Sequence, residues 1–384
     1  MLRRHPWLFS GALESSPDLA PGTIVDVQDT QGRFLARGYY NRASQIRVRL
    51  LTWDQDQAVD GSFWRARLQA SLERRQSLRA SPGTTAFRLV HAEADFLPGL
   101  IVDQYGPWMV VQVLTAGIEA VRQGLVECLE ELVSPRGVYE RSDEPVRRLE
   151  GLEPRAGVLR GEPPPAEGVE ILEEGRRYLA DLTGGQKTGF YLDQRENRTL
   201  VRELAQGCRV LNCFSYTGGF SVAAAAGGAS YLVEVESSAT ALGLARRNLE
   251  LNPECRDTDM EHLCGDAFTV LRQLRTQGAR FDLVVLDPPK FAHRSPQVPS
   301  ACRAYKDINL LAFQLLEVGG ILVTFSCSGL VSPDLFQKVV FGAALDAGVE
   351  AQLLRPLAQA ADHPVLLSFP ESLYLKGLLC RRVA

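Results

Sequence analysis

The sequence predicts an α/β protein with a C-terminal doubly wound sheet domain, preceded by a small β domain and a central α+β domain. Two observations support this prediction. From about Arg209 onward, short apolar segments alternate with helical stretches, which is typical of a parallel sheet covered on both faces. Polar or glycine-rich segments directly follow these apolar segments, as expected where such a sheet binds a ligand.

The C-terminal domain is expected to begin at residue 169, just after the proline-rich stretch GEPPPAEG. Its expected strands are Val210–Phe214, Tyr231–Val235, Phe281–Leu286 and Ile321–Phe325. Its expected helices include Ala239–Leu249 and Ala301–Leu316. The central α+β domain is placed at residues 73–168, with strand candidates Phe87–Val90, Leu100–Val102 and Trp108–Leu114 and a helix at Gly117–Val133.

Residues 1–72 are expected to form a small antiparallel β-barrel. Ile46, Val48 and Leu50 alternate with Arg47 and Arg49, the pattern of a half-buried strand. We therefore expect the apolar side chains to face the core and the two arginines to face solvent or a ligand.

The N-terminal region is basic although the whole chain has a net charge of −4. Residues 1–80 contain 12 arginines and 8 acidic residues, a charge of +4, whereas the other 304 residues contain 30 basic and 38 acidic residues, a charge of −8. Such a surface could contact RNA phosphates. The candidates are Arg3, Arg4, Arg47 and Arg49. An ordinary solvated surface explains the same counts equally well.

Several classes of protein are disfavoured. The chain has no apolar run of the roughly 18 residues that a membrane span needs, and Pro6 and Gly11 interrupt the N-terminus, so a cytoplasmic location is expected. The eight cysteines include no CxxC pair, and the five histidines show no HxH or HExxH spacing. We therefore expect neither a disulfide framework nor a metal.

Four expected strand ends carry residues suited to a nucleotide-like cofactor. The loop Asn212–Gly219 contains adjacent glycines, which allow a tight turn and a close approach of backbone amides to a carboxylate. Glu236 is placed to bind both hydroxyls of a ribose. Asp266 could accept from an exocyclic amine, and Asp287 opens the segment DPPKF. The loop residues assigned to the cofactor are Phe214, Ser215, Tyr216, Thr217, Gly218 and Gly219, joined by Ala267 beside Asp266.

A nicotinamide dehydrogenase shares the order of glycine-rich loop and strand-end acid. The loop here reads TGGFS and lacks GxGxxG, so it has no third glycine of the kind that a pyrophosphate requires. Four ordered strand ends therefore favour S-adenosylmethionine (SAM) as the cofactor and methyl transfer as the reaction.

Cys327 is the candidate nucleophile, because it follows the expected strand Ile321–Phe325 and so lies at the same edge as Asp287. Carbon 5 of a pyrimidine attacks a sulfonium methyl only after a thiolate has added to carbon 6. In this hypothesis Cys327 adds to carbon 6 and Asp287 hydrogen-bonds the ring, while the base that removes the carbon 5 proton is not identified. A buried structural thiol is the alternative for Cys327.

Two other functions stay open. One is methylation of an exocyclic amine of a base, because a DPP motif can accept hydrogen bonds from an amino group. The other is a non-catalytic, RNA-binding ribosome-assembly factor that keeps a cofactor pocket.

The chain also resembles a known family, the RlmI-like class I RNA methyltransferases, over nearly its whole length. The segments that carry the resemblance are HPWLFSGA (5–12), GQKTGFYLDQR (185–195), NCFSYTGGF (212–220), DPPKFA (287–292), YKDINLLA (305–312), FSCSGLV (325–331) and DHPVLLSFPESLYLKGL (362–378).

The resemblance implies a PUA-like RNA-binding N-terminal domain, a Rossmann-like methyltransferase domain and 5-methylcytosine in 23S ribosomal RNA as the product. It also implies that Lys187, Thr188, Phe190 and Asp193 lie near the cofactor or catalytic pocket. Glu236 departs from the Asp that is usual in the family. The modified cytosine and the oligomeric state are left open, with a homodimer as one option.

Overall fold

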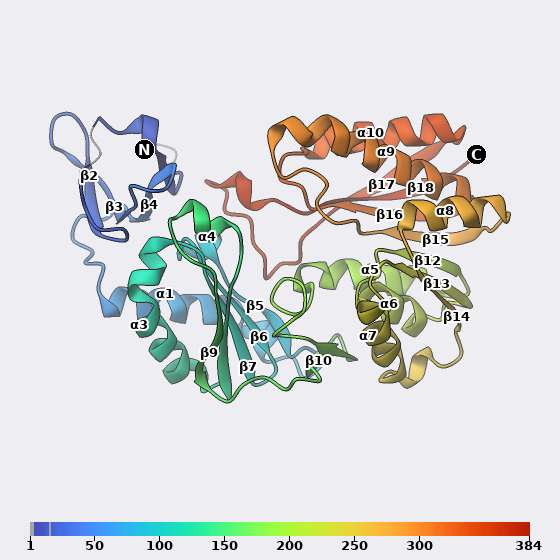
Figure 1. Cartoon of the computed structure of the whole chain (residues 1–384), viewed down its shortest axis with the longest axis horizontal. Helices are drawn as coiled ribbons and strands as arrows, with labels where there is room; N and C mark the ends of the chain where they lie inside the picture. Colours follow the sequence, from blue (N-terminus) through green and yellow to red (C-terminus); the bar gives the residue numbers. More distant parts are fainter. Residues whose placement is uncertain (1–3, 15–16) are drawn as a thin grey trace. The chain divides into compact units, whose positions relative to one another are not determined.

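The computed structural model describes residues 4–14 and 17–384, which group into two compact units (Figure 1). The first unit comprises the residues up to Gly175 together with Ala180–Asp193 and Ala361–Ser372. The second unit comprises Arg176–Leu179, Gln194–Ala360 and Leu373–Ala384. The expected β domain and central domain both fall within the first unit, so the predicted boundaries at 72 and 168 stay predictions.

The chain begins with a four-stranded antiparallel sheet in the order β1-β4-β3-β2. Its strands are β1 (Trp7–Phe9), β2 (Ile24–Gln28), β3 (Phe34–Tyr40) and β4 (Ile46–Thr52). The predicted strand around Val48 is confirmed as β4. Val48 and Leu50 lie buried in a small core with Ala36 and Tyr40.

Arg49 does not follow the predicted pattern, in which both strand arginines face solvent or a ligand. It is only 5% exposed, and its guanidinium donates a 2.8 Å hydrogen bond to Glu150 and lies 3.5 Å from Glu93. A buried guanidinium needs such partners because an unpaired charge is costly to bury. The prediction was wrong for the orientation of Arg49, because carboxylates from the central region cover this face of β4.

The central sheet has five strands in the order β5-β6-β7-β8-β9, with β7 and β8 parallel and the other pairs antiparallel. These strands are β5 (Ala86–His91), β6 (Leu100–Tyr105), β7 (Trp108–Val113), β8 (Gly137–Ser142) and β9 (Arg155–Gly161). The helices of this region are α1 (Gly61–Arg74), α2 (Gln76–Arg79), α3 (Ala116–Val133) and α4 (Val146–Leu149), and β10 spans Val169–Glu173. The predicted elements are confirmed, but β8, β9 and β10 were not predicted.

One apolar core joins the two sheets of the first unit. It combines side chains of α1 and α3 with those of β5, β6 and β7, and it includes Tyr39 and Leu51 from the N-terminal sheet. The buried Tyr39 hydroxyl also lies within hydrogen-bond distance of the carbonyl oxygen of Pro98 and of Oγ1 of Thr115, at 2.8 and 2.9 Å. This shared core explains why both predicted domains belong to one compact unit.

The second unit contains a seven-stranded sheet in the order β14-β13-β12-β15-β16-β18-β17. Its strands are β12 (Arg209–Cys213), β13 (Tyr231–Glu236), β14 (Asp259–Cys264), β15 (Phe281–Leu286), β16 (Leu316–Ser326), β17 (Ala351–Ala358) and β18 (Lys376–Arg382). The first five in the order run parallel, and β18 is antiparallel to both of its neighbours. The four predicted strands are confirmed.

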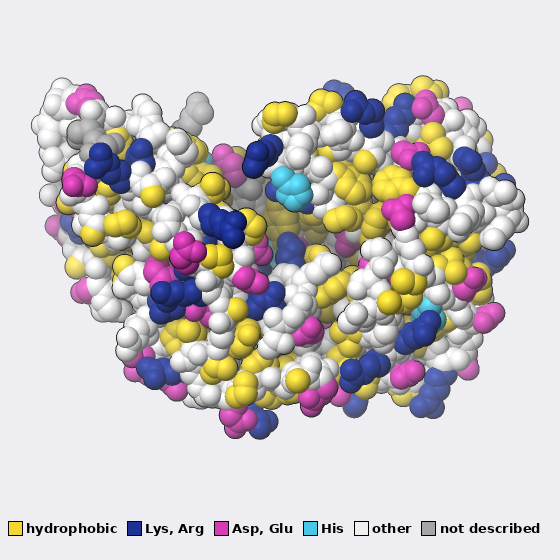
Figure 2. All heavy atoms as spheres, viewed as in Figure 1, with side chains coloured by type: hydrophobic (Ala, Val, Ile, Leu, Met, Phe, Trp, Pro, Cys, Tyr) yellow, Lys and Arg dark blue, Asp and Glu magenta, His cyan; other side chains and the backbone are white. Residues whose placement is uncertain are grey.

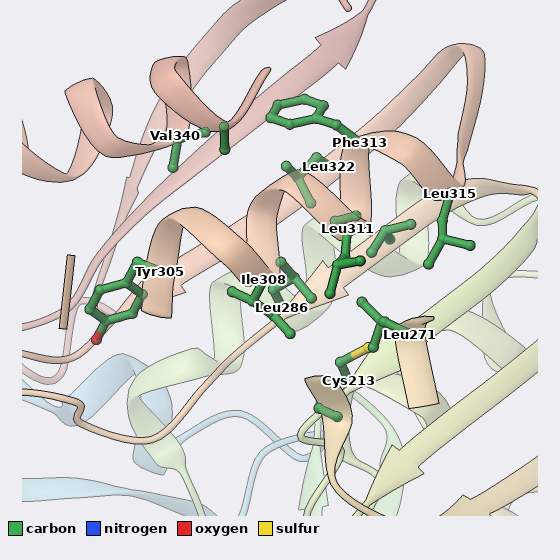
Figure 3. Close-up of a cluster of buried hydrophobic side chains, with 14 of the residues drawn as sticks. Cys213, Leu271, Leu286, Tyr305, Ile308, Leu311, Phe313, Leu315, Leu322 and Val340 are labelled. Atoms are coloured by element: carbon green, nitrogen blue, oxygen red, sulfur yellow. The ribbon is translucent and has the colours of Figure 1, made fainter. Parts of the chain in front are cut away.

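Helices cover both faces of this sheet. They are α5 (Arg195–Leu204), α6 (Gly219–Ala226), α7 (Ala239–Glu250), α8 (Ala267–Thr276), α9 (Val298–Leu315) and α10 (Pro333–Ala347). Leu211 of β12 packs in a core with α8, α9 and α10, whereas the preceding Val210 packs in a core with α5 and α6. Figure 3 shows the first core, in which Leu286 and Leu322 of the sheet lie beside Leu311 of α9. The predicted doubly wound α/β fold is confirmed.

Across residues 4–14 and 17–384, no helix is both long and apolar enough to cross a membrane.

Candidate cofactor and catalytic site

The carboxyl ends of four parallel strands lie at one edge of the second unit's sheet. Cys213, the last residue of β12, pairs with Val235 of β13 and with Leu286 of β15. Leu286 in turn pairs with Thr324 of β16. Because ligands of doubly wound sheets lie beyond this edge, the segments that follow these strands form the candidate site.

The loop after β12 has an unusual backbone conformation. Phe214 and Tyr216 both have positive φ, 61° and 49°, although neither is glycine, and Gly218 follows with φ 77°. Left-handed residues other than glycine are uncommon and tend to occur at functional sites. The loop is fixed by hydrogen bonds from Ser215 N–H to the Val235 carbonyl, 3.1 Å, and from Gly218 N–H to the Ser215 carbonyl, 2.8 Å.

Gly218 is the N-cap residue directly before helix α6, and no side chain caps that end of the helix. A Cβ at this position would lie 2.9 Å from the Cβ of Ala245 and 3.1 Å from Oε1 of Glu234, so no larger residue fits. The first amides of a helix have no partner within the helix and favour an anion. The loop residue Thr217 is buried, and its carbonyl accepts a 2.8 Å hydrogen bond from Asn248.

Glu236, the last residue of β13, is held in place by backbone amides. Its Oε2 accepts from Tyr216 N–H at 2.9 Å, and its Oε1 accepts from Ser238 N–H at 2.8 Å. Oε1 also accepts from the exposed hydroxyl of Ser237 at 3.1 Å. A carboxylate has about four acceptor sites, so these three bonds leave capacity for one further donor, such as a ribose hydroxyl. The side chain predicted to bind a ribose therefore also connects the β12 loop to β13.

Asp266 and Ala267 begin helix α8. Oδ1 of Asp266 accepts hydrogen bonds from both the N–H and the hydroxyl of Thr269, each 2.9 Å long, so the side chain serves as the helix cap. Ala267 is buried beneath it. The ring of the next residue, Phe268, lies 6.2 Å from that of Phe291, the residue that ends DPPKF. The predicted contact of Asp266 with an amine would have to use Oδ2.

Two buried polar atoms support the fit of a charged ligand to this loop. Oδ1 of Asn212 and Oγ of Ser215 make no hydrogen bond with any residue that the structure describes. Leaving a buried polar atom unpaired costs about 1–3 kcal/mol, so such atoms are expected where a ligand completes the bonding. With the α6 amides and Glu236, they fit the carboxylate, ammonium and ribose of SAM.

Asp287 and Cys327 follow the neighbouring strands β15 and β16, and both side chains are partly exposed. Tyr305 of α9 lies close to both. Burial, opposed by hydrogen bonding to Ser326 and Phe291 and reinforced by the charges of Cys327 and Asp287, raises the pKa of Tyr305 to about 12. The predicted nucleophile and the predicted acid thus share one electrostatic environment, with a neutral phenol beside them.

Lys376 is a residue of this site that the sequence reasoning did not single out. It begins β18, is 5% exposed, and donates a hydrogen bond from Nζ to the carbonyl oxygen of Ser328, the residue after Cys327. The sequence feature that could have indicated Lys376 is its position as the one charged residue in the apolar run LYLKGLL (373–379).

The residues that the family resemblance adds to the pocket belong to the first unit. Thr188 is buried and donates a 2.6 Å hydrogen bond to Asp103, and Phe190 is buried too. Lys187 is exposed, with φ 55° and its ammonium 5.7 Å from the ring centre of Tyr191. The roles of these residues toward the cofactor stay predictions.

The remaining RNA candidates differ in exposure. Arg4 is exposed, with its guanidinium 5.9 Å from the ring centre of Trp53. Arg47 is partly buried and donates a 2.7 Å hydrogen bond to the Ser44 carbonyl. Arg3 lies outside the described residues. On the face drawn in Figure 2, Lys and Arg side chains are interspersed with acidic ones.

Comparison with known proteins identifies the class. A family model of SAM-dependent methyltransferases matches residues 152–350, and a model of PUA-like domains matches residues 1–53. A candidate SAM-dependent methyltransferase from Streptococcus mutans has the same fold, with a TM-score of 0.85 and 24% identity over 99% of this chain and 96% of that one. A candidate methyltransferase with the same scores was solved in complex with SAH. The chain is a SAM-dependent methyltransferase.

Relatives extend over almost the whole length. Ribosomal RNA large subunit methyltransferase I of Enterobacter sp. (strain 638) is 48% identical over 382 residues, which cover 99% of this chain and 96% of the relative. The protein of that name from Escherichia coli O139:H28 matches equally well. The chain belongs to the ribosomal RNA large subunit methyltransferase I family. The predicted family and the PUA-like N-terminal domain are confirmed.

Proposed function

We propose that this protein methylates carbon 5 of a cytosine in large-subunit ribosomal RNA, through a covalent adduct between Cys327 and carbon 6 of the base. The observation that carries the proposal is the position of Cys327. Its partly exposed thiol follows β16 at the edge where Asp287 follows β15 and the cofactor loop follows β12.

The proposed reaction needs a donor and an activated acceptor. SAM, when bound, supplies an electrophilic methyl group. The thiolate of Cys327 forms a bond to carbon 6, and the displaced double-bond electrons make carbon 5 nucleophilic. Asp287, when its carboxyl carries a proton, donates a hydrogen bond to the ring nitrogen N3 as negative charge develops there, and its partly exposed side chain is accessible for this contact. After transfer, loss of the carbon 5 proton to a base restores the double bond and expels the thiolate.

Ribosomal RNA is proposed as the substrate on two grounds. The relatives that are 48% identical are named for methylation of large-subunit ribosomal RNA. The N-terminal PUA-like region is basic, and Arg3, Arg4 and Arg47 are the proposed contacts with phosphates. Arg49 is left out, because its guanidinium is engaged by Glu93 and Glu150.

The decisive experiment compares Cys327→Ala with Cys264→Ala, which removes an exposed thiol at the end of the edge strand β14. Transfer of labelled methyl from SAM to unmodified large-subunit RNA should fall to background in the first variant and persist in the second. SAM binding, measured by calorimetry, should be the same in both. Full transfer by Cys327→Ala would exclude the covalent mechanism.

Methylation of an exocyclic amine is the second candidate, and the partly exposed Asp287 at the start of DPPKF favours it. That reaction does not use the thiol. Mass-spectrometric mapping of the methyl group in the RNA product separates the two, because carbon 5 and the amino nitrogen give different modified nucleosides.

A further inference from the structure

A buried lysine lies beside Cys327 in the second unit. Lys376 opens β18 and pairs with Ser326, the last residue of β16, which directly precedes Cys327. The Nζ of Lys376 bonds to the Ser328 carbonyl on the other side of Cys327. The ammonium is therefore fixed at the backbone segment that carries the thiol.

The burial of Lys376 has no evident structural reason. Its neighbours Leu375, Gly377 and Leu378 fill an apolar strand, where an ammonium costs far more to bury than a hydrocarbon side chain. The only hydrogen bond found for Nζ among the described residues goes to one carbonyl. A buried ammonium with a single carbonyl partner is expected to interact with an anionic group in the site.

Cys327 is the candidate for that partner, because Lys376 contacts the residue on either side of it. The pKa of Lys376 is lowered to about 8 as the net result of burial, which lowers it, the negative charge of Cys327, which raises it, and the charge of Lys290, which lowers it. Because the interaction is mutual, an ammonium at this position favours the thiolate of Cys327 over the thiol.

The other charged groups near Lys376 leave this pairing intact. Lys290, after β15, is exposed, so solvent screens its charge. Asp334 of α10 lines the same cavity of about 480 Å³ as Lys376, but its carboxylate is 2.7 Å from the ammonium of Lys338. Asp287 and the neutral phenol of Tyr305 complete the surroundings of the thiol.

We propose that Lys376 is a positioning residue whose ammonium holds Cys327 as the thiolate ready to add to carbon 6. This inference rests on the proposed function, in which Cys327 is the nucleophile. The thiol proton passes to solvent, a sulfur lone pair forms the bond to carbon 6, and Lys376 keeps its three protons throughout. The lysine acts through the cysteine and forms no bond to the base.

The test measures how fast iodoacetamide alkylates Cys327 as the pH is varied, in the full-length protein, with the modified peptide quantified by mass spectrometry. Lys376→Gln keeps a donor for the Ser328 carbonyl but removes the charge. We expect its alkylation midpoint to rise by about one pH unit and its rate at pH 7 to fall about tenfold. Lys376→Arg should resemble the wild type, and the control Lys290→Gln should shift much less.

An unchanged midpoint in a Lys376→Gln protein that binds SAM normally would overturn the inference. If Lys376→Gln does not fold, the interaction can be measured on Lys376 instead of on Cys327. The chain has only five lysines, so the titration of Lys376 can be followed by NMR on lysine labelled at Cε. In Cys327→Ala we expect the pKa of Lys376 to fall further, and no change would equally overturn the inference.

These measurements do not depend on methyl transfer. If Cys327→Ala still methylates RNA, the proposed function fails, whereas the thiol midpoint alone decides whether Lys376 controls the thiolate.

Discussion

Oε2 of Glu236 accepts a 2.9 Å hydrogen bond from the backbone N–H of Tyr216, so the carboxylate that ends β13 also holds the loop that follows β12. The loop adopts its left-handed turns at Phe214 and Tyr216 while tied to this acid. One side chain therefore fixes the conformation of the loop, and in the proposed SAM site its remaining acceptor capacity would be used by the ribose.

Removing the Glu236 carboxylate should weaken the binding of SAM more than it lowers the stability of the fold. We expect Glu236→Ala to raise the Kd for SAM about 10- to 100-fold, because hydrogen bonds to a charged group contribute about 1.5–3 kcal/mol each. Glu236→Asp introduces the residue that is usual in the family, and its Kd for SAM should lie between those of the wild type and Glu236→Ala. Calorimetric titration with SAM measures the effect, with Glu250→Ala at the exposed end of α7 as the control. An unchanged Kd in Glu236→Ala would contradict the assignment.

Gly218 should tolerate no side chain. The Cβ of Gly218→Ala would meet the Cβ of Ala245 at 2.9 Å, at a positive φ that alanine adopts only with strain. We expect a loss of about 1–3 kcal/mol in the free energy of unfolding and weaker SAM binding. Gly243→Ala in α7 is the matched control, because its Cβ has nothing within 4 Å and a helix interior favours alanine over glycine by about 1 kcal/mol. Equal stability of the two variants in urea would refute the steric argument.

His91 should make the first unit less stable in mild acid. Burial lowers the pKa of His91 well below its ordinary value of 6.5, and the charges of Arg88 and His363 lower it further. Below about pH 6.5, His91 is protonated in the unfolded chain but stays neutral in the folded chain. The free energy of unfolding should therefore fall with decreasing pH, by up to about 1.4 kcal/mol per pH unit from this group.

Tryptophan fluorescence can measure this effect selectively, because all four tryptophans, at positions 7, 53, 64 and 108, belong to the first unit. Urea titrations between pH 5 and 7 should show a flatter pH dependence in His91→Gln than in the wild type. The exposed His293 provides the control, since His293→Gln should leave the slope unchanged. A slope that is identical in all three proteins would rule out a buried neutral His91.

The sequence was most informative where a strand is covered on both faces. The strands β12, β13, β15 and β16 read as apolar runs because helices pack on each side of them. The strand β14 lies at the sheet edge, exposes Asp259 and Glu261, and shows no such run, so it was not predicted. The edge strand β17 is likewise mostly exposed.

The features that escaped prediction depend on contacts between distant segments. Arg49 looked like a surface residue because its partners, Glu93 and Glu150, come from another part of the chain. Lys376 gains its place beside Cys327 only through the pairing of β18 with β16. The positive φ of Phe214 and Tyr216 could not be predicted from residue type either, since such residues rarely adopt it.

Because each compact unit is made of several separate chain segments, the two units cannot easily be produced as separate fragments. The chain passes from one compact unit to the other at 175/176, 179/180, 193/194, 360/361 and 372/373. A fragment that stops at Gly175 would lack Ala361–Ser372, which belong to the first unit. A fragment that starts at Gln194 would lack β11 (Arg176–Ala180). It would also keep Ala361–Ser372 of the first unit between β17 and β18. Neither half can be obtained with a single cut. Comparing the contributions of the two units therefore requires point substitutions rather than truncation.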